Sequence, residues 1–422
     1  MAVIKGFKGL RFTDKAGDIS TLICPPYDII DNNMRTELIN KNEYNLVRLE
    51  LPEGENKYES AGKLYTKWLS DGILKQDEKD CIYIYKETFS VNGEQKSFKG
   101  IICNVRLEEF EKGVVLPHEN TLSKAKTDRF NLMSATYANF SQIYSMYMDD
   151  EKVTSARLDK LSAKDADITA LDADGIKHEL WIIDDQSQIS ELVSEFASRQ
   201  LFIADGHHRY ETALNFRNKL IENGSLSDMP NAAYCMMFLV DMEDSGLVVF
   251  PTHRLVKNLP DFDENKILNK LNSFYNIEKL GKANIEDCLK AHADDHAAVW
   301  YTGKDYCYLL TVNDLTDVKK FNPDMSDYSC DLDVTVLHTL AMEKCLNISK
   351  EDMANQTYIS YTRSIDEAFS EVENGKYQCS FILNATKVSQ IKDVAKAGEK
   401  MPQKSTYFYP KLITGLVMNK LN

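Results

Sequence analysis

The spacing of apolar and polar residues divides the first half of the chain into short strands and amphipathic helices. Five β-rich runs predict strands, at Cys81–Phe89, Gly100–Leu107, Asp167–Leu171, His178–Ile183 and Ala233–Val240. Apolar residues recur at helical spacing in Ala61–Leu69, Lys126–Ala135 and Gln188–Ala197. The dipeptide Asp174-Gly175 lies between two of these strands and predicts a hairpin. Strand pairs mixed with helices in this order favour an α+β fold.

After Pro260 helices and strands alternate more closely. Helices are predicted at Asn265–Phe274, Ile285–Ala291, Val334–Lys344, Ile365–Glu373 and Val388–Gly398, and strands at Ile277–Leu280, Ala297–Tyr301, Tyr306–Val312, Tyr358–Tyr361 and Cys379–Leu383. We therefore predict a catalytic region at 1–260, a small α/β module at 261–325, and a C-terminal α/β segment at 326–422 that returns toward the catalytic site.

Composition and charge restrict the class of protein. The 422 residues carry a net charge of −15, which argues against a general nucleic-acid-binding surface because such a surface must neutralise phosphates. The nine cysteines are odd in number and form no C-x-x-C pair, so neither a disulfide framework nor a structural zinc site is expected. The start of the chain is too charged for a signal peptide, and no apolar run approaches the roughly 20 residues of a membrane span. We expect a cytoplasmic protein with neither a membrane nor a nucleic-acid partner.

One segment places several polar side chains between an apolar run and an amphipathic run. Residues Leu201–Ala204 predict a buried strand, and residues 210–220 have helical spacing. The residues between them, which we predict to form a turn, are Asp205, Gly206, His207, His208 and Arg209. A strand that ends in glycine and opens a helix presents backbone N–H groups and the positive end of the helix dipole. Two imidazoles and a guanidinium there predict a phosphate site, whereas the simpler alternative is a helix cap formed by Asp205.

A second polar segment lies at Leu116–Leu132. Its candidate residues are His118, Glu119, Thr121, Lys124, Asp128 and Arg129. Glu119 has the chemistry of a general base, and the lysines and Arg129 have the chemistry to hold anionic oxygens. A solvated loop that leads into an amphipathic helix is the alternative, and from this segment alone it is the favoured one.

Further candidates are scattered along the chain. Tyr27 and Asp28 follow two prolines that fix an extended backbone. Glu50 and Arg48 form a charged pair that we predict at the end of a strand. His253 follows a β-like run, where an ordinary surface ion pair with its neighbour is an equal alternative. The stretch 398–405 approaches the form of a phosphate loop, but Gln403 replaces the second glycine, so only Lys404, Ser405 and Thr406 are kept as side-chain donors.

Five motifs together resemble a widespread bacterial family known as domain of unknown function 1015. They are CPPYDII (24–30), PHENTLSKAKTDR (117–129), ADGHHRYETAL (204–214), PTHRLV (251–256) and KSTYFYPKL (404–412). The third motif also resembles the signature turn of the ParB/sulfiredoxin superfamily, and this resemblance implies a ParB/sulfiredoxin-like core. His207 stands where sulfiredoxins have their reacting cysteine, and only Gly206 and Arg209 match partition proteins. Free-serine kinases are most similar, since they share Asp205, Gly206, His207 and Arg209.

The resemblance to free-serine kinases implies a small-molecule phosphotransferase that uses ATP or ADP with Mg²⁺ and acts on free serine or phosphoserine. In this hypothesis His207, His208 and Arg209 hold phosphate oxygens, and Asp205 orients an imidazole or binds the metal. Further positive charges that contact the phosphate are expected from Lys124, Arg129, His253 and Lys404. Glu119 deprotonates the acceptor hydroxyl, and Glu50 is a second candidate for this base.

Two alternatives remain open at this point. One is a nucleotide-binding regulator that does not turn its ligand over. The other is a metal-dependent hydrolase or phosphatase that uses His118, Glu119, His207, His208 and His253, because histidine with carboxylate suits zinc or iron. The partners implied are a nucleotide and a small-molecule substrate, and the sequence fixes neither a metal-ligand set nor an oligomeric state.

Overall fold

The structure is a computed structural model that describes residues 1–119 and 123–422, with the side chains of 120–125 left aside. The chain forms two compact units. Unit 1 comprises Met1–Pro117, Thr121–Leu247 and Pro410–Asn422, and unit 2 comprises His118–Asn120 and Val248–Tyr409. The fold class is α+β, as the sequence predicts. The predicted regions 261–325 and 326–422 both lie in unit 2, except for residues 410–422, which belong to unit 1.

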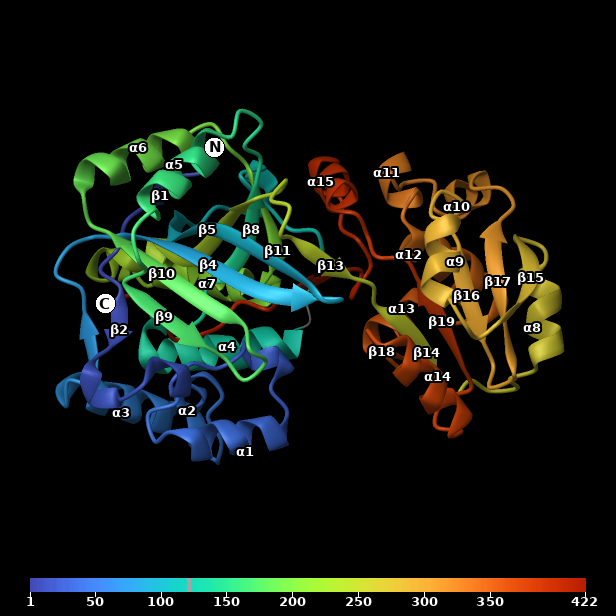
Figure 1. The fold of residues 1–422 in the computed structure, drawn as a ribbon, viewed down its shortest axis with the longest axis horizontal. Coiled ribbons are helices and arrows are strands. Elements are labelled where there is room, and N and C mark those ends of the chain that lie inside the picture. The colour runs from blue at the N-terminus through green and yellow to red at the C-terminus, as the bar shows by residue number, and fades with distance from the viewer. Residues whose placement is uncertain (120–122) are drawn as a thin grey trace. The chain divides into compact units, whose positions relative to one another are not determined.

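A nine-stranded mixed sheet forms the centre of unit 1 (Figure 1). Eight strands lie side by side in the order β6 (Val115–Leu116), β11 (Leu201–Asp205), β8 (Ile143–Tyr147), β12 (Tyr234–Asp241), β5 (Glu94–Arg106), β4 (Ile82–Val91), β10 (Lys177–Ile183) and β9 (Ile168–Leu171), and β1 (Ile4–Lys5) pairs with β5. The pairs β6–β11 and β8–β12 are parallel, and the other pairs are antiparallel. Two small ladders join β2 (Leu10–Phe12) to β3 (Leu74–Gln76) and β7 (Ala138–Asn139) to β21 (Asn419–Lys420).

Two hairpins set the register of the antiparallel half of this sheet. β4 and β5 are joined at Asn92 and Gly93, which both have positive φ, 52° and 81°. This is the geometry of a two-residue turn that follows the twist of the strands. β9 and β10 are joined around Gly175, whose φ is 77°, so the hairpin predicted at Asp174-Gly175 is confirmed.

Helices cover the sheet and bury its apolar residues. The helices of unit 1 are α1 (Asn32–Lys41), α2 (Val47–Glu50), α3 (Lys57–Ser70), α4 (Ser123–Thr136), α5 (Val153–Leu161), α6 (Gln186–Phe196) and α7 (His207–Glu222), with short 3₁₀ turns η1 (Asp14–Ala16), η2 (Ile19–Thr21), η3 (Tyr27–Ile29), η4 (Phe110–Lys112), η5 (Leu226–Asp228) and η6 (Pro230–Ala233). Leu158, Leu192 and Leu214, from α5, α6 and α7, pack with Ile84 and Met237 of the sheet in one apolar core.

The segment Arg48–Glu50, predicted as a strand end, is instead helical. Asn45 accepts a hydrogen bond from the backbone N–H of Val47 and so supports the first turn of α2. Arg48 donates to the carbonyl of Ile39, so it does not form the predicted charged pair with Glu50. The helix places Glu50 in the interior of unit 1, where only 3% of it is exposed.

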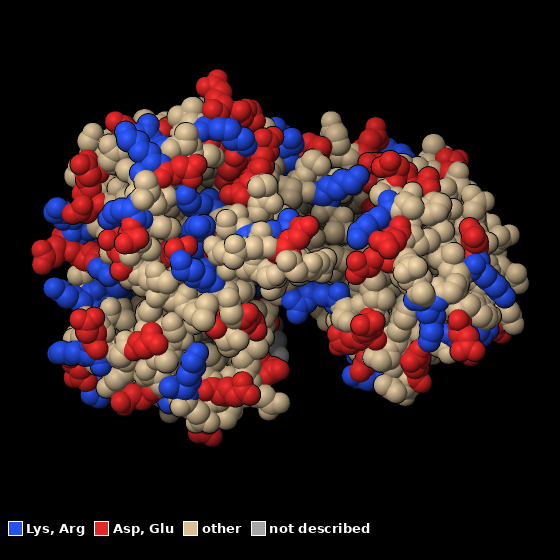
Figure 2. Space-filling model, viewed as in Figure 1, with Lys and Arg blue, Asp and Glu red and all other residues tan. Residues whose placement is uncertain are grey.

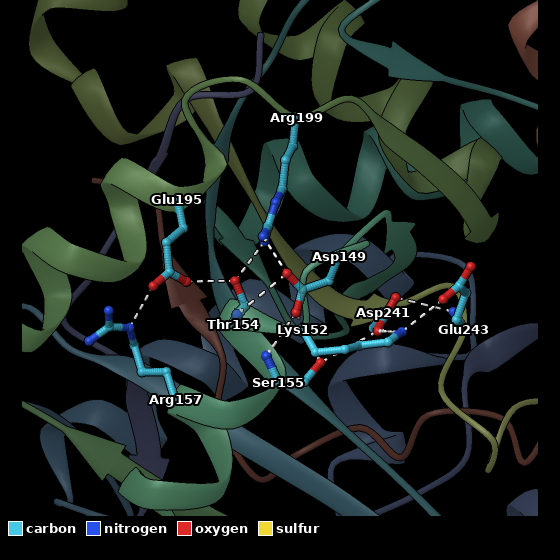
Figure 3. A network of polar contacts seen from close by, with 9 residues as sticks. All are labelled: Asp149, Lys152, Thr154, Ser155, Arg157, Glu195, Arg199, Asp241 and Glu243. Carbon is cyan, nitrogen blue, oxygen red and sulfur yellow. Dashed lines mark hydrogen bonds and ion pairs between the residues drawn. The ribbon is translucent and has the colours of Figure 1, made fainter.

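A network of charged side chains ties α5 and α6 to the ends of β8 and β12 (Figure 3). Asp149 is buried and accepts hydrogen bonds from Arg199 Nη2 at 2.6 Å and from the backbone N–H of Ser155 at 2.9 Å. Lys152 bridges Asp241 and Glu243 at 2.7 and 2.9 Å. Because its members are partnered with one another, we assign the network a structural role.

We expect Asp149→Asn to lower the free energy of unfolding by about 2–3 kcal/mol, because it removes a charge that several buried donors share. Urea denaturation of the full chain measures this loss. Asp159→Asn on the same α5 is the matched control, since the Asp159 side chain is 76% exposed and its ion pair with Lys99 is largely solvated on the Asp159 side. Equal stability of the two variants would contradict the structural role of Asp149.

A second buried polar cluster lies on β4 and β10. His178 Nδ1 is 2.8 Å from the hydroxyl of Tyr85, and His178 Nε2 is 3.2 Å from a carboxylate oxygen of Asp172. Tyr85 donates to Glu87 at 2.5 Å, and Glu87 is fully buried. Burial alone would lower the pKa of His178, but Asp172 and Glu87 outweigh it and raise the pKa to about 9. His178 is therefore charged at neutral pH, although it is buried.

This raised pKa gives the stability of the protein a defined pH dependence. The unfolded value is about 6.5, so the contribution of His178 is complete below about pH 6.5 and is lost as the pH rises through about 9. We expect His178→Gln to destabilise the protein more at about pH 6 than at about pH 9.5. Urea titrations at both pH values test this, with His292→Gln as control, because the His292 side chain is 38% exposed. An equal loss at both pH values would show that His178 carries no charge in the fold.

Unit 2 is built on a six-stranded antiparallel sheet. Its strands lie in the order β15 (Tyr275–Gly281), β17 (Tyr306–Val312), β16 (Ala298–Tyr301), β19 (Cys379–Leu383), β14 (His253–Val256) and β18 (Ile359–Thr362), and a separate pair joins β13 (Val248–Phe250) to β20 (Tyr407–Tyr409). The helices are α8 (Glu264–Leu271), α9 (Ile285–Ala291), α10 (Thr316–Phe321), α11 (Asp327–Cys330), α12 (Asp333–Val336), α13 (Lys350–Asn355), α14 (Ile365–Glu373) and α15 (Val388–Lys396).

The predicted helix Val334–Lys344 exists but changes type along its length. It begins as α12 and continues as a π-helix, η7, over Leu337–Cys345. Most residues of η7 are buried, and Leu340 and Met342 are fully buried in a large apolar core of this unit. A π-helix is rare, and short ones are frequent at functional sites.

Three further features bear on the class of protein. Within the described residues, no helix is long and apolar enough to cross a bilayer. The nine cysteines are all free thiols, and eight of them are buried, as the sequence predicts. On the face drawn in Figure 2, Lys and Arg side chains alternate with Asp and Glu and form no continuous basic patch.

Candidate functional site

The predicted phosphate turn in unit 1 is a tight corner between a strand and a helix. β11 ends at Asp205, Gly206 has φ 95° and ψ 25°, and α7 begins at His207. The helix thus starts three residues earlier than the pattern from Tyr210 predicts, because the N–H of Tyr210 bonds the carbonyl of Gly206 at 3.0 Å. His207, His208 and Arg209 therefore form the first helical turn.

Glycine is required at position 206 for two reasons. Its positive φ is unfavourable for residues that carry a Cβ atom. A Cβ atom built there would also lie 2.9 Å from Nε of Arg209, so the guanidinium could not keep its place. Gly206 thus lets Arg209 fold back over the turn.

Asp205 is held by two cations. One carboxylate oxygen accepts from Arg209 Nη2 at 2.6 Å, and the other forms an ion pair with Lys411 from the C-terminal segment of unit 1. Burial alone would raise the pKa of the Asp205 carboxyl, but Lys411 and Arg209 outweigh it and keep the pKa well below its usual range. Arg209 Nη1 also donates to the carbonyl of Gln142 at 2.6 Å. The turn therefore combines one carboxylate with two cations at the start of α7.

A second group of predicted residues surrounds Arg129 on α4. Arg129 Nη2 donates to Asp128 at 2.6 Å, and Arg129 Nη1 donates to the backbone carbonyl of Glu50 at 2.8 Å and lies 3.5 Å from its carboxylate. The guanidinium stacks over the ring of Tyr27 at 4.0 Å. Glu50 also accepts from the hydroxyl of Ser141 at 3.0 Å. Arg129 is buried, so it joins three of the candidate residues in one electrostatic cluster.

Neighbouring charges shift the titration of two members of this cluster. Burial alone would raise the pKa of Asp128, but hydrogen bonds from Lys57 and Arg129 hold it at about 2. Burial, reinforced by Asp28, raises the pKa of Tyr27 to about 12, although Arg209 and Arg129 act in the opposite direction. Tyr27 therefore stays protonated at neutral pH.

A small cavity of about 40 Å³ connects the Arg129 cluster with the turn. Glu50, Arg129 and Arg209 all line it. A water molecule takes up about 30 Å³ of liquid volume, so this space is of the order of a single water. Unit 1 thus brings together the predicted residues Tyr27, Glu50, Asp128, Arg129, Asp205, Gly206 and Arg209, and it also contains Asp28, His207 and His208.

The remaining described candidates belong to unit 2. A Glu119 carboxylate oxygen accepts from the backbone N–H groups of Ser405 and Thr406, at 3.2 and 3.3 Å, and lies 3.2 Å from the Thr406 hydroxyl. His118 Nε2 is 3.0 Å from the same hydroxyl. The carboxylate of Glu119 therefore fixes the backbone before β20, which is a structural use of the residue predicted to be the base.

His253 differs from its predicted role as a cation. It is 1% exposed on β14, and its Nδ1 accepts a hydrogen bond from the backbone N–H of Leu383. Burial, together with the neighbouring Arg254, lowers the pKa of His253 to about 4. The imidazole is therefore neutral at physiological pH and cannot neutralise a phosphate. Lys404 is exposed, and its carbonyl accepts from Arg254 at 3.2 Å.

Two candidates, Thr121 and the side chain of Lys124, lie outside the described residues. Within the described part of the chain, no three His, Cys, Asp or Glu side chains are grouped so that they could hold a metal ion. The histidines of the metal-hydrolase alternative are divided between the units, with His207 and His208 in unit 1 and His118 and His253 in unit 2.

Comparison with known proteins identifies the family. The family model described as protein of unknown function (DUF1015) matches residues 4–335. The chain belongs to this family. No curated protein matches the chain.

Solved structures that resemble this DUF1015 protein have low sequence identity to it. A conserved hypothetical protein from Pyrococcus furiosus is 15% identical, with 76% of this chain and 95% of that chain covered and a TM-score of 0.36. Free serine kinase in complex with AMP is 12% identical, with 76% and 91% covered and a TM-score of 0.36. SbnI with a C-terminal truncation, from Staphylococcus aureus, is 11% identical, with 75% and 86% covered and a TM-score of 0.36.

Sequence reasoning missed Lys411 as a member of the turn. Lys411 stands seven positions after Lys404 in the same motif of this DUF1015 protein, yet the resemblance to a phosphate loop directed attention to 404–406. The Lys411 side chain is 10% exposed and pairs with Asp205, which is distant in sequence. One feature of the sequence could have indicated its role. Lys411 lies in an apolar, aromatic segment, and a lysine buried in such a segment needs an acidic partner.

Proposed function

We propose that unit 1 binds the phosphates of ATP or ADP at the turn Asp205–Arg209 and transfers a phosphoryl group to a small hydroxy compound such as free serine. The observation that carries the proposal is that two cations, Arg209 and Lys411, meet the single carboxylate of Asp205 at the start of α7. A helix start provides N–H donors and a favourable dipole for an anion, and cations beside it strengthen the attraction.

Arg209 and Lys411 have different roles in this proposal. Arg209 Nη1 and Nη2 bond Gln142 and Asp205, so Arg209 holds the shape of the turn. Lys411 has a flexible side chain with three donors, so it can share them between Asp205 and a phosphate oxygen. His207 and His208 lie in the first turn of α7, at the end of the helix whose dipole and backbone N–H groups favour an anion.

Glu50 is our candidate for the general base. It is the carboxylate that lines the same small cavity as Arg209 and Arg129. In the transfer step the acceptor oxygen forms a bond to phosphorus, and the bond between phosphorus and the nucleotide oxygen breaks. The hydroxyl proton passes to Glu50 through one water, because the cavity at Glu50 has room for no larger molecule. Arg129 holds Glu50 in place for this step, through its backbone carbonyl and its carboxylate.

The residues at the turn do not form a metal site of their own. Asp205 is the carboxylate there, and each of its oxygens already pairs with a cation. We therefore derive no step from a protein-bound metal. Mg²⁺ that accompanies a nucleotide is held largely by the phosphates and water, so it can arrive with the ligand.

Phosphorus NMR tests the transfer. The protein is incubated with Mg²⁺, ATP or ADP, and a panel of hydroxy amino acids, and new phosphoester signals are sought. We expect a phosphoester with the unaltered protein and a loss of about a hundredfold or more in rate for Glu50→Gln, as is usual for a general base. Glu53→Gln is the matched control, since Glu53 is an exposed acid of the same segment.

The outcomes separate the alternatives. Nucleotide binding without any phosphoester would favour the regulator, and the absence of both would overturn the proposal. If Glu53→Gln slowed transfer as much as Glu50→Gln, Glu50 would not be the base.

A further inference from the structure

Unit 2 contains a cavity of about 200 Å³ that no residue of the predicted phosphate site lines. Its walls come from α12 and the π-helix η7, from α13, from Tyr361 of β18 and from residues 400–403. Sites for drug-sized ligands measure roughly 300–1,000 Å³, so this cavity is too small for a nucleotide. Its size suits a molecule such as a free amino acid.

The π-helix explains how polar groups reach this cavity. The N–H of Leu346 bonds the carbonyl of Ala341 at 3.0 Å, five residues earlier, as in a π-helix. His338 and Glu343 are also five residues apart, and both line the cavity. In an α-helix with about 3.6 residues per turn they would point to different sides.

His338 presents a hydrogen-bond donor whose tautomer is fixed. Arg254 Nε donates to His338 Nε2 at 3.2 Å, and a guanidinium cannot accept, so the imidazole proton is on Nδ1. In the described part of the chain, nothing accepts a hydrogen bond from that Nδ1. Burial, with Arg254 acting in the same direction, lowers the pKa of His338 well below its usual range, so the ring is neutral.

Arg254 makes this donor suited to an anion. The guanidinium is buried and contacts neutral groups, namely the carbonyls of Thr252 and Lys404 and the ring nitrogen of His338. No carboxylate of the described chain forms an ion pair with Arg254. Burial lowers the pKa of Arg254 to about 10, although Tyr361 and Glu119 oppose the shift. A buried charge polarises the group it touches, so the Nδ1–H of His338 favours an anionic oxygen.

Two more groups of the cavity wall lack a partner. Thr335 is 2% exposed, and no described residue bonds its hydroxyl. Glu343 forms no ion pair with any described residue, and burial raises its pKa although Lys350 and Lys344 oppose the shift. Buried polar groups in native proteins are normally bonded, so the unpaired hydroxyl of Thr335, beside the half-buried Glu343 in the same cavity, indicates a ligand.

The rest of the wall contains apolar and polar residues. The apolar ones are Met325, Met353, Ala354, Met401 and Pro402, and the polar ones are Asn322, Thr339, Lys350, Lys400 and Gln403, with Tyr361 beside them. We propose that this cavity binds a free α-amino acid with an apolar side chain, whose carboxylate accepts hydrogen bonds from His338 and Thr335 and whose ammonium group donates to Glu343. The site uses no residue of unit 1, so it does not depend on the proposed phosphoryl transfer.

Calorimetry with ligand analogues tests this site on the unaltered protein. L-leucine and L-methionine are the probes, N-acetyl-L-leucine lacks the ammonium group, and L-leucinamide lacks the carboxylate. We expect saturable binding of at least one free amino acid and binding weaker by about tenfold or more for each blocked analogue, because the blocked group leaves a buried partner unpaired. Absence of saturable binding by both amino acids, or equal binding of the analogues, would overturn the proposal.

A pair of variants then locates the site. Glu343→Gln is expected to weaken amino-acid binding by about tenfold, whereas Glu351→Gln on α13 should leave it unchanged, because Glu351 is exposed and does not line the cavity. If Glu343→Gln bound the amino acid as tightly as the unaltered protein does, the amino acid would bind outside this cavity. The analogue series needs no variant, so it decides the matter even if Glu343→Gln does not fold.

Discussion

Asp205→Ala is expected to abolish nucleotide binding and to lower the free energy of unfolding by about 3–5 kcal/mol, because it leaves two largely buried cations without a counterion. The Arg209 and Lys411 side chains are only 12% and 10% exposed, so water cannot replace the lost carboxylate. Their mutual repulsion would also open the corner that Gly206 closes. Urea denaturation measures the first effect, and calorimetry with ADP measures the second.

A double variant separates these two effects. Asp205→Ala with Lys411→Met removes one cation together with the acid, so we expect it to recover part of the stability but none of the nucleotide binding. Asp159→Ala is the control for loss of an exposed acid of unit 1 and should change stability by less than about 0.5 kcal/mol. If Asp205→Ala were as stable as Asp159→Ala, the ion pairs of the turn would not hold it together.

Arg129→Met is the second variant with a large expected effect. It removes the cation that pairs with the buried Glu50 and with Asp128 while it keeps an apolar side chain of similar length. A buried carboxylate left without its partner costs about 3–5 kcal/mol, so we expect a loss of this size in urea denaturation. We also expect phosphoryl transfer to fall, since Glu50 would lose the guanidinium that positions it.

Glu50→Gln in the Arg129→Met background provides the check on this mechanism. The amide carries no charge, so the double variant should be more stable than Arg129→Met alone. Arg106→Met is the matched control, because the Arg106 side chain is 47% exposed and its loss should cost little. A double variant less stable than Arg129→Met would show that the charge of Glu50 is not what makes Arg129 necessary.

The local pattern of the sequence predicts most elements of this fold but not how they assemble. The strand Leu201–Ala204 and the hairpin at Asp174-Gly175 follow from side-chain spacing and turn chemistry, and both are present. Spacing and turn chemistry do not predict that residues 410–422 belong to unit 1. That assignment depends on the pairing of β21 with β7, which is distant from it in sequence. Periodicity carries no information on such long-range pairing.

Helix starts and helix types were the weaker predictions. Polar residues at 207–209 hide the true start of α7, since polar side chains suit a first helical turn as well as a loop. The change from α12 to the π-helix η7 leaves no mark in the hydrophobic spacing, because residues on every side of η7 are buried. The same segment then carries His338 and Glu343, which sequence reasoning did not consider.

The candidate site was predicted in its parts rather than as a whole. The residues around the turn and around Arg129 were named from sequence, and unit 1 brings Glu50, Arg129 and Arg209 to one cavity. Lys411 was missed because its partner is remote in sequence, and His253 was assigned a charge that its burial removes. Sequence shows which chemistry is available, whereas burial decides which groups keep their charge.

Nucleotide binding by Lys411→Met tests the central claim most directly. Calorimetry with ADP and with ATP, each with Mg²⁺, compares the unaltered protein with Lys411→Met and with Lys219→Met, which removes an exposed lysine from α7. The phosphate turn predicts binding by the unaltered protein, a loss of about tenfold or more in affinity for Lys411→Met, and little change for Lys219→Met. Absence of nucleotide binding by the unaltered protein, or equal affinity of the two variants, would contradict a phosphate site at Asp205–Arg209.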